Sequence, residues 1–130
     1  MKRILIGDDN KLIRRALIET INREDFEILE VENGKQILQK FEEYQPDLLI
    51  MDIKMPGING LEVLKKIRTV NQELPIIIIS AYKGLEKDPE ITLGKISAFM
   101  TKPIDIEVLR AKVTEILGER MNPKVWGNLY

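Results

Sequence analysis

The sequence predicts a doubly wound α/β domain in which helices cover both faces of a five-stranded parallel sheet of order 2-1-3-4-5. Two observations predict this fold class. Short apolar runs alternate five times with segments of helical periodicity. The run Ile76–Ile79 is apolar at every position rather than at alternate positions, as in a parallel strand buried on both faces. A length of 130 residues leaves room for a single core.

Three strand and helix units are regular. Their strands are expected at Arg3–Gly7, Phe26–Val31 and Leu48–Met51. Each strand precedes a segment whose apolar residues recur three or four positions apart, the spacing of one helix face. These residues are Ile13, Ala16, Leu17 and Ile21 in the first helix, Ile37, Leu38, Phe41 and Tyr44 in the second, and Leu61, Leu64 and Ile67 in the third. Asn33 can cap the second helix and Asp105 the fifth.

The last two units differ from each other. The fourth strand, Pro75–Ile79, is followed by a segment in which Pro89 interrupts the helical pattern. Because Pro is tolerated in the first turn of a helix, we expect a short or mobile fourth helix that begins near Asp88. The fifth strand, Ser97–Thr101, leads into a regular fifth helix that Gly118 is placed to end.

Residues 1–118 are therefore expected to form the domain, and residues 119–130 a C-terminal tail or linker remnant in which Trp126 is loosely packed.

A net charge of −1 does not indicate a nucleic acid or a membrane as partner. The chain has no Cys and no His, which excludes thiolate metal sites and the commonest general base. No apolar stretch is long enough for a signal peptide or a membrane span, so a cytoplasmic location is the default. No helix-turn-helix pattern follows Gly118, so we expect no DNA binding by this chain.

Polar residues follow four of the predicted strands: Asp8 and Asp9 the first, Asp52 the third, Ser80 the fourth and Lys102 the fifth. Taken alone, each is a common loop or surface residue. In an open parallel sheet, however, the ligand crevice lies beyond the carboxyl ends of the strands, and the first and third strands are neighbours in the predicted order. Three carboxylates that converge there repel one another unless a cation is bound.

An all-oxygen site of this kind suits Mg²⁺, with Mn²⁺ as the alternative ion. Lys102 adds a second positive charge opposite the acids, and Ser80 adds a hydroxyl donor. Two cations, one donor and a nucleophilic carboxylate form a site for an incoming phosphoryl group.

Four motifs at these positions resemble the receiver domain of bacterial two-component response regulators, over Met1 to Gly118. They are ILIGDDN (Ile4–Asn10), LLIMDIKMPGING (Leu48–Gly60), IISAY (Ile78–Tyr82) and FMTKP (Phe99–Pro103). Each motif is weak alone, whereas the four in this order are highly specific. The resemblance implies a flavodoxin-like (βα)5 fold and a single-domain receiver of the chemotaxis or phosphorelay type.

The resemblance also implies a role for each site residue. Asp52 is the phosphoacceptor, and Asp8 and Asp9 form the acidic pocket. Mg²⁺ is held in that pocket by Asp9, Asp52 and the backbone carbonyl of Lys54.

Two residues on the fourth and fifth strands complete the implied site. Ser80 and Lys102 engage the phosphoryl oxygens, and the Lys102–Pro103 peptide is cis. Phe99 occupies the position where many receivers carry a switching Tyr, so a buried ring remains and its hydroxyl is lost.

Further positions depart from the receiver pattern or vary within it. Gly7 stands where a β-branched residue is usual, which we expect to loosen the packing under the site, and Ile104 stands where Phe is common. Lys54 and Tyr82 each lie two residues beyond a site residue and are expected to border the crevice. The pair resembles those of slower receivers in phosphorelays, in which access of water to the phosphoryl group is hindered.

The implied function is a signalling switch rather than an enzyme with turnover. A histidine kinase or histidine phosphotransfer protein donates the phosphoryl group to Asp52. The face formed by the fourth helix, fifth strand and fifth helix then changes and controls a downstream protein partner or output domain.

Three alternatives stand beside this function. The first is the receiver of a longer, for example DNA-binding, regulator. The second is a receiver-like interaction module that is never phosphorylated, which an intact site does not favour. The third is a flavin or nucleotide binder, which Asp8 and Asp9 disfavour because a phosphate-binding loop needs exposed amide groups.

Overall fold

The structure, a computed structural model, describes residues 1–118 and contains a parallel sheet of five strands in the order β2-β1-β3-β4-β5. The strands are β1 (Lys2–Gly7), β2 (Phe26–Val31), β3 (Leu48–Asp52), β4 (Ile76–Ser80) and β5 (Ala98–Thr101). The helices are α1 (Lys11–Ile21), α2 (Gly34–Tyr44), α3 (Gly60–Val70), the 3-10 helix η1 (Leu85–Lys87), α4 (Pro89–Leu93) and α5 (Ile106–Ile116). The predicted fold class and strand order are confirmed. The predicted tail, residues 119–130 with Trp126, lies outside the described residues.

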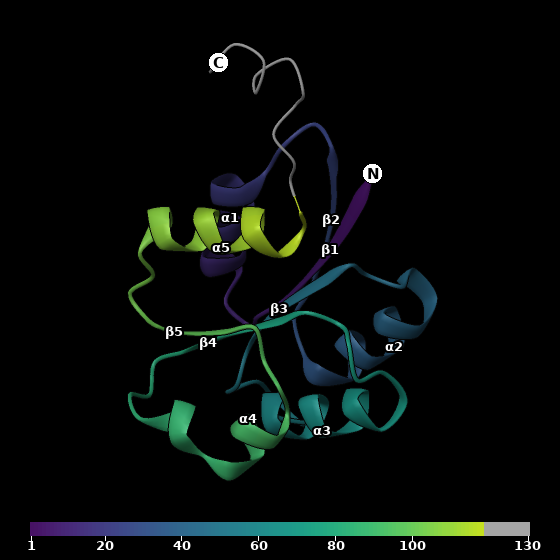
Figure 1. Cartoon of the computed structure of the whole chain (residues 1–130), viewed down its shortest axis with the longest axis vertical. Coiled ribbons are helices and arrows are strands. Elements are labelled where there is room, and N and C mark those ends of the chain that lie inside the picture. Colours follow the sequence, from purple (N-terminus) through teal and green to yellow (C-terminus); the bar gives the residue numbers. More distant parts are fainter. Residues whose placement is uncertain (119–130) are drawn as a thin grey trace.

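Helices cover both faces of the sheet. Figure 1 shows α1 and α5 on one face and α2, α3 and α4 on the other. Every residue of β3 and β4 is buried, as expected for central parallel strands. Side chains alternate between the faces: Ile76 and Ile78 pack in the core with α2, α3 and α4, while Ile77 and Ile79 pack in the core with α1 and α5. The sheet is thus held from both sides, and its carboxyl edge remains for the site.

Asn or Asp side chains cap the α-helices at their first turns, as the sequence predicts for α2 and α5. The Asn33 side chain accepts a hydrogen bond from the N–H of Gln36, and Asp105 accepts from two N–H groups of α5. Asp88 caps α4, whose first residue is Pro89, and α4 has only five residues. The expected short fourth helix is confirmed. None of the helices within residues 1–118 has the length and apolar character that a membrane crossing requires.

Arg68 anchors the C-terminal end of α4. Its buried guanidinium donates hydrogen bonds to the backbone carbonyls of Gly94 at 2.6 Å, Leu74 at 2.7 Å and Asn71 at 3.0 Å. Gly94 is the residue that caps α4, and Leu74 precedes β4. Burial lowers the pKa of Arg68 below its ordinary value. One side chain therefore ties α3, the end of α4 and the start of β4 together, whereas η1, at the other end of α4, has no buried residue.

The expectation that Gly7 loosens the packing under the site is wrong. A Cβ atom at Gly7 would lie 2.7 Å from the Cγ1 of Ile37 and closer still to its Cδ1. Ile37 belongs to α2 and is fully buried. The side chain that Gly7 lacks is replaced by the end of Ile37, so the volume is filled from the neighbouring helix.

Substitutions at these two residues, made singly and together, test this packing. Gly7→Val should lower the free energy of unfolding by about 1–3 kcal/mol because it overpacks a filled core. Ile37→Ala should lower it by about 2–5 kcal/mol because it opens a cavity. The double variant should lose clearly less than the sum, since the new Val fills that cavity. Urea unfolding of the four proteins measures this coupling, and additive losses would contradict it.

Candidate functional site

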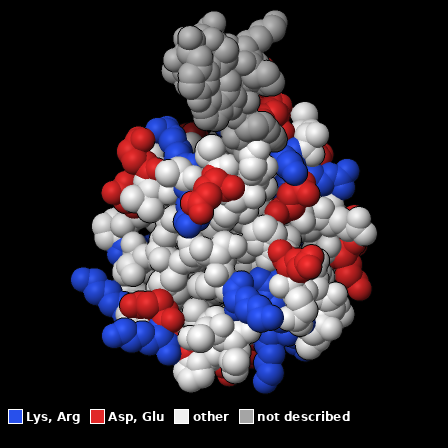
Figure 2. Space-filling model, in the orientation of Figure 1, with Lys and Arg blue, Asp and Glu red and all other residues white. Residues whose placement is uncertain are grey.

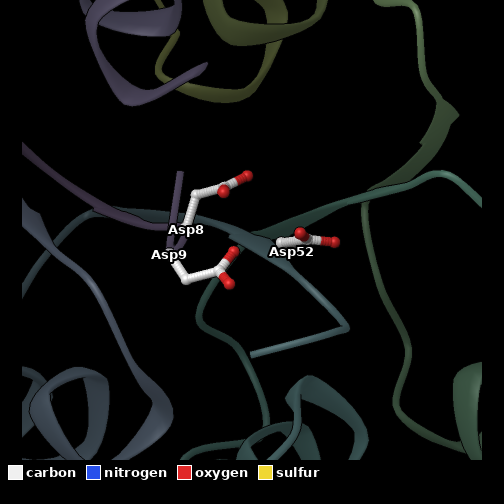
Figure 3. A group of neighbouring side chains, drawn as sticks. All are labelled: Asp8, Asp9 and Asp52. Carbon is white, nitrogen blue, oxygen red and sulfur yellow. The ribbon is translucent and has the colours of Figure 1, made fainter. Parts of the chain in front are cut away.

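Three carboxylates meet at the carboxyl edge of the sheet. Asp8 directly follows β1, Asp9 comes next, and Asp52 is the last residue of β3. Strands β1 and β3 are neighbours, which brings these positions together. One carboxylate oxygen from each of the three residues lies within 4.8 Å of the corresponding oxygens of the other two. Figure 3 shows Asp8 and Asp9 side by side with Asp52 across from them.

The surroundings of the three acids differ. Asp8 is 1% exposed and Asp52 is 7% exposed, whereas Asp9 is exposed to solvent. Burial raises the pKa of Asp8 above its ordinary value, and the charge of Asp52 raises it further, against a hydrogen bond from the Asn10 N–H. The Asn10 N–H lies 2.8 Å from Asp8 Oδ1, and the Ile53 N–H lies 2.8 Å from Asp52 Oδ1. Two buried acids thus lie close together. The repulsion between their ionised carboxylates destabilises the fold, and a nearby cation reduces this repulsion.

Lys102 supplies one positive charge to this pair. Its Nζ lies 3.1 Å from Asp52 Oδ2 and 3.3 Å from Asp8 Oδ2. Burial lowers the pKa of Lys102, but the hydrogen bonds and charges of Asp52 and Asp8 outweigh this effect, and the pKa lies above its ordinary value. The ammonium group therefore stays charged. Lys102 follows β5, and its peptide bond to Pro103 is cis.

Ser80 ends β4 and is fully buried. Its Oγ accepts a hydrogen bond from the N–H of Tyr82 at 3.0 Å. Its backbone carbonyl accepts a hydrogen bond from the N–H of Lys102 at 2.8 Å. Ser80 therefore links the loop after β4 to the residue that carries the site's ammonium group.

Lys54 and Tyr82 contact each other across two loops. The Nζ of Lys54 donates a hydrogen bond to Tyr82 Oη at 3.3 Å and lies 5.9 Å from the centre of the ring. Lys54 comes two residues after Asp52, and Tyr82 two residues after Ser80. Both side chains are exposed, with Tyr82 at 48%. The loops that follow β3 and β4 are thus bridged at their outer surface.

Phe99, the predicted switch position, lies on β5 beside Ile78 of β4. Its ring is half-buried rather than fully buried and packs against the core that α2, α3 and α4 share. It therefore lies on the edge strand, within reach of a change in the neighbouring loop after β4.

The donor set suits a hard divalent cation. Only oxygen donors are present, two of them on buried carboxylates and one on the exposed Asp9. Mg²⁺ binds such groups through one or two carboxylates and retains several waters. The exposed position of Asp9 leaves room for those waters, so the residues present fit the ion.

Sequence reasoning missed one buried residue beside this site, Arg14. The NH1 group of its guanidinium donates a hydrogen bond to the backbone carbonyl of Asp8 at 2.7 Å. A signal was present in the sequence, because Arg14 lies three residues before Leu17 and seven before Ile21, on the apolar face of α1. A charged residue in an apolar stripe indicates a buried partner.

The raised pKa of Asp8 predicts how stability depends on pH without metal. Because the folded-state pKa exceeds the unfolded one, ionised Asp8 lowers stability at neutral pH, and this loss vanishes as pH falls below the ordinary value of 3.8. In EDTA, Asp8→Asn should therefore raise the free energy of unfolding at neutral pH. This gain in stability should shrink as the pH is lowered. Urea unfolding over a pH series measures it, with the exposed Asp9→Asn as control. A variant less stable than wild type at neutral pH would refute this account of Asp8.

Comparisons with known proteins agree with this geometry. The family model of the response regulator receiver domain matches residues 4–114. Sporulation initiation phosphotransferase F of Bacillus subtilis is 35% identical over 122 residues, which make up 93% of this chain and 98% of that protein. Polar-differentiation response regulator DivK of Brucella anthropi is 28% identical over 120 residues, 91% of this chain and 98% of that protein.

Solved structures show the same fold. The crystal structure of response regulator TrrA from Thermotoga maritima, in complex with Mg²⁺ and BeF, has a TM-score of 0.81 to this chain at 38% identity. The similarity covers 89% of this chain and 99% of TrrA. The sheet order, the acids at its carboxyl edge and the match of the family model together show that the chain belongs to the response regulator receiver domains, a family of phosphoacceptor signalling domains.

Proposed function

We propose that Asp52 is the phosphoacceptor of this receiver and that its phosphorylation depends on Mg²⁺. One observation carries the proposal: Asp52 is a buried acid that shares a lysine ammonium group, 3.1 Å away, with a second buried acid. This carboxylate lies at the carboxyl edge of the sheet and already faces a cation. The negative charge of an incoming phosphoryl group would therefore find the ammonium group of Lys102 already in place.

The metal site would be formed by Asp9, Asp52 and the backbone carbonyl of Lys54, with Asp8 beside them. When bound, Mg²⁺ supplies positive charge that offsets the oxygens of the incoming phosphoryl group. Mn²⁺ has the same preference for oxygen ligands and would serve as a substitute. Asp8, which is buried and hydrogen-bonded to the Asn10 N–H, keeps its carboxylate directed toward Lys102.

In the transfer step, a carboxylate oxygen of Asp52 attacks the phosphorus of a phosphohistidine. The new bond joins that oxygen to phosphorus, and the phosphorus–nitrogen bond to the donor imidazole breaks. Lys102 Nζ moves from Asp52 Oδ2 to a phosphoryl oxygen, a short displacement because it already lies 3.1 Å from the carboxylate. The Ser80 hydroxyl, which now only accepts from the Tyr82 N–H, turns to donate to a second phosphoryl oxygen.

The response is proposed to spread through the loop after β4. A turn of Ser80 toward the phosphoryl group pulls on Tyr82, and η1 follows, since of its residues only the partly buried Leu85 packs against the core. Arg68 keeps the far end of α4 in place, so the change concentrates between residues 80 and 94 and next to Phe99. Figure 2 shows a largely uncharged band between α5 and α4 on this side of the molecule. This α4-β5-α5 face is the proposed contact for a downstream protein partner or output domain.

The proposed donor is a histidine kinase or a histidine phosphotransfer protein. The name of the Bacillus subtilis relative, a phosphotransferase, supports a place in a phosphorelay, in which the phosphoryl group is passed on. On this proposal the chain is not an enzyme with an external substrate. Its only reactions are its own phosphorylation and dephosphorylation at Asp52.

Intact-protein mass spectrometry with Mg²⁺ and acetyl phosphate tests the phosphoacceptor. The wild type should gain one phosphoryl group, and Asp52→Asn should gain none, because the nearly isosteric amide is not a competent acceptor. Asp25→Asn, at an exposed acid near the opposite end of the sheet, should react as the wild type does, and EDTA should block the reaction. Uptake by Asp52→Asn at wild-type stoichiometry would refute the assignment.

We also propose that Lys54 and Tyr82 prolong the phosphorylated state. Hydrolysis of an acyl phosphate needs a water in line with the phosphorus–oxygen bond. The Lys54 side chain and the Tyr82 phenol meet at 3.3 Å, each in the loop that follows the strand ending in Asp52 or Ser80. Neither group is a carboxylate or an amide of the kind that would orient such a water. The contact therefore limits the approach of water to phospho-Asp52.

Replacing this pair should shorten the lifetime of phospho-Asp52. The double variant Lys54→Asn with Tyr82→Glu removes the contact and adds groups that bind water, and its hydrolysis should be roughly tenfold faster. Lys83→Asn, at an exposed lysine in the same loop, should decay at the wild-type rate. Phosphate release at fixed Mg²⁺ and pH measures the decay. Equal rates for the double variant and the wild type would end the proposal.

A further inference from the structure

Arg14 is a buried charge for which the proposed chemistry has no role so far. The buried polar and charged residues of the described chain are Asp8, Arg14, Asp52, Arg68 and Ser80. Three of them belong to the site and Arg68 anchors α4. Burial of a guanidinium is costly unless it is paired and hydrogen-bonded. The contacts of Arg14 therefore indicate what it does.

The guanidinium of Arg14 joins three elements next to the acidic pocket. It lies on α1 and donates to the carbonyl of Asp8, after β1, at 2.7 Å and to Oε1 of Glu30, on β2, at 2.8 Å. The side chain of Arg14 is 10% exposed and that of Glu30 is 43% exposed. The N–H of Asp8 donates to the carbonyl of Val31 at 3.2 Å, so both backbone groups of Asp8 are held.

The carbonyl that Arg14 binds belongs to the peptide group between Asp8 and Asp9. The orientation of this peptide plane, together with ψ of Asp8 and φ of Asp9, sets the directions in which the two side chains leave the backbone. Asp8 is also held by its own burial and by the Asn10 N–H, whereas Asp9 is exposed. Of these contacts, the one that Arg14 makes with the backbone next to Asp9 is therefore the one that bears on the direction of the Asp9 carboxylate.

We propose that Arg14 is a positioning residue for the divalent-metal site. It holds the Asp8–Asp9 peptide so that both carboxylates face Asp52, and Glu30 orients the guanidinium for that contact. The contact is made to a backbone carbonyl, so Arg14 acts through geometry rather than by neutralising a carboxylate of the pocket. The fork of an arginine reaches a carbonyl and a carboxylate at once, which a lysine ammonium group does not reproduce. The inference rests on the proposed Mg²⁺ site.

Calorimetric titration of the unphosphorylated protein with Mg²⁺ tests this role without any phosphoryl donor. Arg14→Gln should weaken Mg²⁺ binding by about tenfold, the scale of losing a residue that supports a metal ligand. Arg14→Lys should also weaken it, and Glu30→Gln less so. Arg15→Gln removes an exposed arginine from the same helix and should bind as the wild type does.

A purely structural role gives a different result. It would lower the melting temperature of Arg14→Gln and Arg14→Lys while Mg²⁺ affinity stays at the wild-type value, and this outcome would overturn the inference. In phosphorylation by acetyl phosphate, we expect the half-saturating Mg²⁺ concentration to rise in both variants while the rate at saturating Mg²⁺ stays near wild type. Failure of the wild type itself to bind Mg²⁺ would overturn the proposed function as well. Wild-type binding with unchanged variants would overturn only the role of Arg14.

Discussion

The contact of Lys102 with Asp8 and Asp52 is the interaction on which the rest of the site depends. Two acids are buried at the ends of adjacent strands, where each disfavours the ionisation of the other. A single ammonium group at 3.1 and 3.3 Å offsets part of this cost and links β5 to β1 and β3. Two buried acids with one half-buried lysine leave negative charge in excess, and this excess favours a divalent metal. Because the charges of this site are not balanced, a charged ligand that binds there can change the way in which its groups are paired.

The elements around the site are held unevenly, which gives such a change a direction. The sheet is fixed from both faces, and Arg68 holds the C-terminal end of α4 through backbone carbonyls. The loop between Ser80 and α4 has weaker support, since η1 packs against the core only through the partly buried Leu85. When Lys102 is drawn to a new charge, the loop after β4 is the segment that costs least to move. The acidic pocket is held firmly by comparison, because α1 and β2 support the backbone of Asp8 through Arg14 and Glu30.

Much of this molecule could be predicted from local sequence pattern. The strands, the Asn33 and Asp105 caps and the short α4 follow from hydrophobic periodicity and capping chemistry, which act over a few residues. The positions of Asp8, Asp9 and Asp52 followed from the strand order. Ile37 filling the space above Gly7 and Arg14 reaching Glu30 were not predicted. These contacts join side chains from different elements, and periodicity carries no information on which side chains meet across an interface.

The most direct measurement of the central claim is a crystal structure with Mg²⁺ and beryllofluoride, a mimic of the phosphoryl group. The account predicts beryllium bonded to a carboxylate oxygen of Asp52 and Mg²⁺ beside Asp9. It also predicts that Lys102 Nζ has left its position 3.1 Å from Asp52 Oδ2 for a fluoride. Beryllofluoride bound elsewhere, or Lys102 still paired with Asp52 while beryllofluoride occupies the site, would contradict the account.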